Sequence, residues 1–176
     1  MAVISIQMTL NMVLPRDDRS RSLQQKLWER ARDLSFSRYG GANPVGWAAA
    51  LDESAAGPYE LGSEPDLVSA IRRAAAAMRA TGRPVGLVMW RGRHAWVMSG
   101  FTGLGDPATM PNFEVTGVRV LDPLYPNGHD TWGPSPKPNS ILAPEELGRQ
   151  FVSRPSDRGY LGAVSGYVLI LPVPTA

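Results

Sequence analysis

Two residues of this chain have the types and the spacing of a catalytic base and its orienting carboxylate. His94 begins an apolar run typical of a strand, directly after the tight turn 91–93, and Asp122 ends a later alternating run. If these strands pair antiparallel, the start of one lies beside the end of the other. A carboxylate that accepts from one imidazole nitrogen fixes the tautomer and leaves the other nitrogen as a general base. The spacing therefore predicts a His94–Asp122 pair, although His94 packed beside Trp96 and a turn at Asp122 fit the same residues.

The remaining polar residues do not form the pattern of a metal or cofactor site. The chain has two histidines and no cysteine, and the second histidine, His129, lies in a loop and is expected to be solvated. Two separated histidines without cysteines do not make a closed zinc site, and no carboxylate-rich loop suggests calcium. Residues 103–105 lack the later glycine and the helix of a nucleotide-binding fingerprint. We therefore expect no metal and no cofactor.

Composition narrows the class of protein further. The chain has 176 residues, 43% of them hydrophobic and 19% charged, which is typical of a globular domain. Its net charge of +2 gives no basic stripe for nucleic acid. No apolar stretch approaches the roughly 18 to 20 residues of a membrane span. The N-terminus also lacks the pattern of a signal peptide, so we expect a cytoplasmic protein, or a secreted or cell-surface one whose targeting segment is missing from this sequence.

Helical patterns dominate the first half of the chain. Apolar residues recur at spacings of three and four, and capping or helix-stopping residues flank the later segments. Ser63 is the expected N-cap of the clearest helix, and Gly82 its stop. The predicted helices are 3–14, 20–34, 43–51 and 63–82.

Extended patterns follow after Gly82. The expected strands are 84–90, 94–101, 113–122 and 167–171, the first two joined as a hairpin. The stretch 126–138 is too rich in proline and glycine for regular structure, and a short helix is expected at 145–151. Helices first and antiparallel strands after them predict an α+β fold, with residues 1–176 forming a single domain.

Three of these segments together resemble a known enzyme family. The stretch 92–101, preceded by 82–85 and followed by 120–123, resembles the catalytic half of papain-like cysteine peptidases of the bacteriocin-processing, double-glycine-leader type. The resemblance implies a papain-like fold, with His94 as the base and Asp122 as its orienting partner. Segment 5–12 resembles the helix that follows the family's nucleophilic cysteine.

The chain departs from that family at the nucleophile. Counting back from Ser5, the cysteine position falls at or before Met1, and a methionine thioether has no thiolate form. Either the sequence begins one motif too late, or the protein is a pseudoenzyme that keeps the cleft. A third alternative is that Ser5, one helical turn deeper, supplies a hydroxyl nucleophile, although the resemblance makes it a packing residue.

The expected function is that of a cysteine-peptidase-like hydrolase domain, inactive or N-terminally truncated as written. Its partner would be a peptide or protein, and Trp47, Trp96 and Trp132 are candidates to line the groove unless they lie in the core. A noncatalytic peptide- or partner-binding module using the same cleft is the alternative from another class. An acyltransferase is a further one, because relatives of this fold pass the acyl group to an amine.

Overall fold

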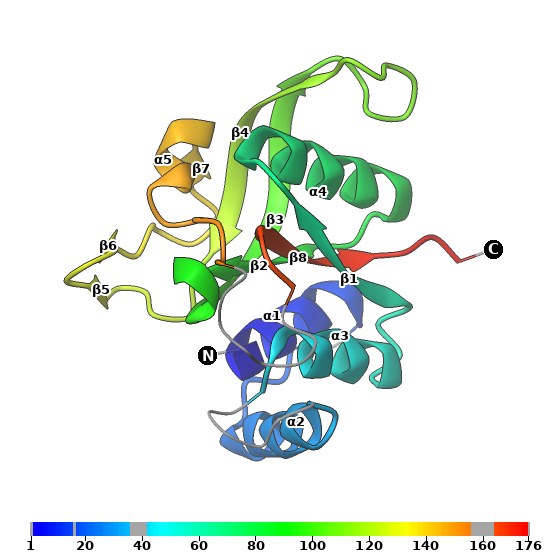
Figure 1. Cartoon of the computed structure of the whole chain (residues 1–176). Coiled ribbons are helices and arrows are strands. Elements are labelled where there is room, and N and C mark those ends of the chain that lie inside the picture. The colour runs from blue at the N-terminus through cyan, green and yellow to red at the C-terminus, as the bar shows by residue number, and fades with distance from the viewer. Residues whose placement is uncertain (1, 16, 36–41, 156–163, 176) are drawn as a thin grey trace.

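An antiparallel sheet separates two groups of helices. The computed structural model describes residues 2–15, 17–35, 42–155 and 164–175 (Figure 1). Six strands lie in the order β1-β8-β2-β3-β4-β7. The chain starts with three helices and then alternates between strands and shorter helices; in order, the main elements are α1 (Ala2–Val13), α2 (Arg21–Asp33), α3 (Pro44–Glu53), β1 (Tyr59–Glu64), α4 (Leu67–Thr81), β2 (Val85–Met89), β3 (His94–Leu104), β4 (Glu114–Leu121), β7 (Ile141–Leu142), α5 (Pro144–Gly148) and β8 (Tyr167–Pro172). The predicted α+β arrangement, with N-terminal helices followed by an antiparallel sheet, is confirmed.

The strands carry two apolar cores because successive side chains point to opposite faces of the sheet. Leu87, Met89 and Trp96 face α4 and α5, whereas Val88 and Ala95 face α1, α2 and α3. Each core is fully closed to solvent at its centre. This alternation leaves no room for a one-residue shift in register, so it fixes which face each residue of β3 occupies.

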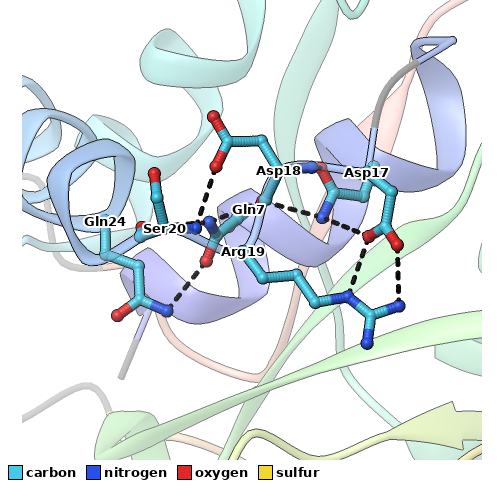
Figure 2. A network of polar contacts seen from close by, with 7 residues as sticks. Gln7, Asp17, Asp18, Arg19, Ser20 and Gln24 are labelled. Carbon is cyan, nitrogen blue, oxygen red and sulfur yellow. Dashed lines mark hydrogen bonds and ion pairs between the residues drawn. The ribbon is translucent and has the colours of Figure 1, made fainter.

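A polar network joins α1 to α2 and the loop between them (Figure 2). Gln7 is 4% exposed. Its Nε2 donates to the carbonyl of Asp18 at 2.7 Å, and its Oε1 accepts from Nε2 of Gln24 at 2.9 Å. Asn11 adds a second donor to the Asp18 carbonyl at 3.0 Å. Both ends of the buried Gln7 amide are therefore paired, and the network holds α1 in place.

The structure corrects the predicted start of the clearest helix. Ser63 is not its cap: α4 begins after Asp66, whose side chain accepts from the amide of Ser69. Residues 59–64 instead form β1, which pairs with β8 from the far end of the chain. The Ser63 hydroxyl donates to the carbonyl of Ser165. The prediction failed because a capping pattern depends on neighbouring residues only. The conformation of this segment is decided by its pairing with β8, which lies far away in the sequence.

Regular structure also occurs in the loop where none was expected. Two short strands, β5 (Gly128–His129) and β6 (Gly133–Pro134), form their own antiparallel ladder. Glycine makes this close approach possible, since a Cβ on Gly128 would lie 2.6 Å from the carbonyl oxygen of Gly133. The prediction of a loop without regular structure at 126–138 was therefore wrong in this part.

Candidate active site

A left-handed turn places His94 at the start of β3. The turn η1 (Trp90–Gly92) joins β2 to β3, and φ is +54° at Trp90, +56° at Arg91 and +91° at Gly92. Only the last of these residues is a glycine, so the first two adopt a conformation that L-residues rarely occupy. The hairpin register then pairs Met89 with His94. The turn was predicted, but its left-handed conformation was not.

The structure brings His94 and Asp122 together. Nε2 of His94 lies 2.7 Å from Oδ1 of Asp122, and both side chains are 0% exposed. The contact follows from the antiparallel pairing of β3 with β4, in which Val97 lies opposite Leu121. The two side chains thus form the pair that the spacing indicated.

Asp122 is held by more than the histidine. Its Oδ2 accepts from the hydroxyl of Ser135 at 2.5 Å, and its Oδ1 accepts from the amide of Leu124 at 2.9 Å. Burial raises the pKa of Asp122, but the hydrogen bonds from His94, Ser135 and Leu124 outweigh it and leave the pKa below its usual value. The carboxylate is therefore charged and fixed in orientation. Sequence reasoning missed Ser135, because it lies in the breaker-rich loop and carries no motif.

The second nitrogen of His94 has no partner. Nδ1 is buried, and no hydrogen bond reaches it in the part of the chain that the structure describes. Since Nε2 faces an ionised carboxylate, the neutral ring carries its proton on Nε2 and a free lone pair on Nδ1. A buried acceptor without a partner costs free energy. The arrangement leaves one basic nitrogen of a rigidly held imidazole available for proton transfer.

An aromatic group covers the imidazole. The Trp90 ring stacks on His94 with centroids 4.0 Å apart and an interplanar angle of 26°. The Trp90 ring also lies 5.0 Å from the ring of His129 and 6.3 Å from that of Trp132. The exposed loop that carries His129 therefore packs against the site.

Ser5 has a structural contact in place of a catalytic one. Its buried hydroxyl donates to the carbonyl of Ala95 at 3.0 Å. Among the described residues no hydrogen bond joins it to His94, so the geometry does not support the hydroxyl-nucleophile alternative. The contact does place the first turn of α1 beside the start of β3. The family's nucleophile position, at or before Met1, lies outside the described residues.

Two of the three tryptophans predicted to line a groove lie in the cores instead. Trp47 is 1% exposed and Trp96 is 0% exposed, and they belong to the cores on opposite faces of the sheet. They cannot contact a peptide on the surface, and that prediction was wrong for both. Trp132 is half-buried, and its ring stacks on Trp90, the ring that covers His94. Trp90, rather than Trp96, is the tryptophan that matters at the site.

A pocket of about 350 Å³ has none of these site residues in its lining, which consists of 55–57, 80–81, Arg83 and 174–175. Arg83 is its charged lining residue. Its guanidinium donates to the carbonyls of Ala56, Pro58 and Val173. Arg83 therefore holds the C-terminal segment against the rest of the fold, and its terminal nitrogens are already bonded to backbone carbonyls.

No protein-family model, curated protein or solved structure matches the chain. Within the described ranges, no three His, Asp or Glu side chains gather as a metal site. None of the helices described is long and apolar enough to cross a membrane. A function must therefore be argued from the geometry around His94.

Proposed function

We propose that this chain carries the histidine–aspartate half of a cysteine-peptidase-like site. His94 has the role of the general base and Asp122 orients it. The pair would serve a thiol nucleophile on the N-terminal side of α1, which this sequence does not contain. The observation that carries the proposal is the buried Nδ1 of His94, which has no hydrogen-bond partner among the described residues, while Nε2 is bonded to Asp122. Such an acceptor lowers stability, so a free Nδ1 fits a general base better than a histidine that only supports the fold.

The chemistry that this pair supports is acyl transfer. Nδ1 takes the proton of the thiol, and the thiolate attacks an amide carbonyl carbon. The tetrahedral intermediate collapses, the C–N bond breaks, and the proton on Nδ1 goes to the leaving amine. Water then attacks the thioester, gives a proton back through Nδ1, and releases the acid and the thiol. An amine in place of water would make the protein an acyltransferase.

The place of the thiol follows from α1. The Ser5–Ala95 contact brings the first turn of that helix to the start of β3, where His94 lies. A residue just before the helix would also face its positive end, which lowers the pKa of a thiol. Both the resemblance and this contact favour the same position for the nucleophile.

A noncatalytic peptide-binding module is the second candidate. It is favoured by the absence of cysteine from the sequence and by the complete burial of the His94 side chain. In that case the His94–Asp122 pair is a structural remnant. The two candidates differ in whether a thiol placed at the N-terminus is activated.

The test is a chain extended at its N-terminus by a cysteine, at the position where the resemblance places the nucleophile. We expect iodoacetamide to alkylate the new thiol at pH 7 about tenfold faster than a free thiol, whose pKa is about 8.5. His94→Ala should remove most of that advantage. Gln25→Ala, on the exposed side of α2, is the control, and it should leave the rate unchanged.

A thiol that reacts like an unperturbed one, and that does not respond to His94→Ala, overturns the proposal in favour of the binding module. Circular dichroism of each variant shows that the fold is kept. If the thiol is activated, product analysis with and without an amine acceptor separates hydrolysis from acyl transfer.

A further inference from the structure

Gln150 contacts Trp90 through both its main chain and its side chain. The backbone amide of Trp90 donates to the carbonyl of Gln150 at 3.0 Å. The indole Nε1 of Trp90 donates to Oε1 of Gln150, also at 3.0 Å. The remaining end of the amide, Nε2, donates to the carbonyl of Pro134 at 3.0 Å. The oxygen and the nitrogen of this side-chain amide are therefore both bonded. Gln150 bonds Trp90 twice, once through its backbone carbonyl and once through its side chain.

These bonds hold Trp90 in a costly conformation. A φ of +54° is unfavourable for a residue with a large side chain, and such strain persists only where surrounding contacts enforce it. Gln150 supplies those contacts from the segment after α5. That segment is itself anchored, because Leu147 and Phe151 on either side are 0% exposed. The strain in the turn is thus balanced by a rigid neighbour.

The conformation has one visible consequence, the covering of His94. The indole lies against the imidazole face, and the histidine side chain is 0% exposed although the preceding residues 91–93 are exposed. Excluding water strengthens the hydrogen bond between His94 and Asp122, because competing solvent is removed. A freely rotating Trp90 would let water reach the ring.

We propose that Gln150 is a positioning residue for His94, acting through the Trp90 indole. It keeps the His94–Asp122 bond dry, and thereby helps Asp122 to hold the ring in the tautomer with the proton on Nε2. The inference rests on the proposed function, because a general base needs Nδ1 free. The contacts among Gln150, Trp90 and His94 do not depend on a thiol.

The experiment uses the native chain with ¹⁵N-labelled histidine and follows the ring nitrogens by NMR. The chain has two histidines, so a His129→Gln variant assigns both sets of signals. In the parent protein we expect His94 to show a proton on Nε2 that exchanges slowly with water and an unprotonated Nδ1. Gln150→Met keeps the length of the side chain but loses its hydrogen bonds to the Trp90 indole and to the Pro134 carbonyl. The loss of the bond to the indole should speed that exchange about tenfold. It should also let the other tautomer appear.

A double-mutant cycle tests the route through the indole. Trp90→Phe keeps a ring over His94 but lacks the N–H that Gln150 accepts. If Gln150 acts through that N–H, the double variant should exchange no faster than the more affected single variant. Gln25→Met is the matched control for the substitution, because Gln25 is exposed and bonds only to Glu29, and it should change nothing.

Two results overturn the inference. One is a Gln150→Met protein that melts at a lower temperature while the exchange rate and the tautomer of His94 stay as they were, which makes Gln150 merely structural. The other is a double variant whose effects multiply, which shows that Gln150 does not act through the indole. Failure of the proposed function is separate, because it appears as an unactivated thiol in the extended chain, whatever the exchange rate of His94.

Discussion

Two buried polar networks in this protein differ in how completely their polar atoms are paired. Around Gln7, between α1 and α2, the buried amide finds a partner for its oxygen and for its nitrogen (Figure 2). Around His94, the carboxylate of Asp122 accepts three hydrogen bonds, yet Nδ1 of the imidazole accepts none from the described residues. The backbone shows the same contrast, since α1 is regular and the turn before His94 is left-handed.

The comparison separates a network that serves stability from one whose geometry fits the proposed chemistry. In a network where every buried polar group is paired, the hydrogen bonds offset the free energy lost when those groups leave water. An unpaired acceptor beside strained backbone lowers the stability of the fold and adds no contact to it. Features of this kind gather at functional sites. The predictions below measure this difference.

The largest effect is expected from Asp122→Ala. The change leaves Nε2 of His94, the Ser135 hydroxyl and the Leu124 amide without their acceptor, so the free energy of unfolding should fall by about 3 kcal/mol. Urea unfolding measures it. Asp17→Ala is the control, because its contacts with Arg19 and Asn11 are exposed, and it should cost less than about 1 kcal/mol. Equal losses in the two variants would contradict a buried, structurally coupled pair.

A smaller loss is expected when the closed network is opened. Gln7→Met removes a buried amide together with its hydrogen bonds to Asp18 and Gln24, and should lower the free energy of unfolding by about 1–2 kcal/mol. Gln25→Met, on the exposed side of α2, should stay within about 0.5 kcal/mol of the parent. If Gln7→Met were neutral, the network would not be what holds α1, and the contrast with the His94 site would lose its basis.

The hydroxyl of Ser5 should matter to packing alone. Ser5→Ala removes the donor to the Ala95 carbonyl and should cost about 1 kcal/mol in urea unfolding. A fluorophosphonate directed at nucleophilic serines should label neither the parent nor the variant. Labelling of the parent that disappears in Ser5→Ala would identify a serine nucleophile and remove the need for a thiol.

The smallest effect is the acid dependence of stability. The pKa of Asp122 is lowered in the folded state, so the carboxylate stabilises the fold above its unfolded pKa of about 3.9 and this stabilisation is lost as the pH falls through the folded-state pKa below it. Urea midpoints measured from pH 5 to pH 2 should therefore fall, and Asp122→Asn should flatten that fall.

Salt separates this buried carboxylate from an exposed one. The pKa of Asp106 is also lowered, chiefly by its hydrogen bond with Arg79, but this pair lies at the surface. High salt should suppress the contribution of Asp106 and leave that of Asp122 in place, since screening acts on exposed charges. An Asp122 contribution that vanished in salt would show that solvent reaches the pair.

Local patterns in the sequence determined most of the elements and the identity of the central pair. Helical periodicity and the Asn43 cap located α1, α2 and α3, and the β2–β3 hairpin followed from its apolar runs around a glycine turn. His94 and Asp122 were found because antiparallel pairing puts strand starts beside strand ends, which is a rule of geometry that needs no side-chain detail.

Only the tertiary structure decided the surroundings of that pair. Ser135 and Gln150 reach Asp122 and Trp90 from loops far along the chain, and β1 replaced the start of a helix because β8 lies beside it. Trp47 and Trp96 lie in the cores because strand alternation and helix packing set their faces. Contacts between distant segments depend on how the whole chain packs, whereas periodicity, caps and turns depend on a few neighbouring residues.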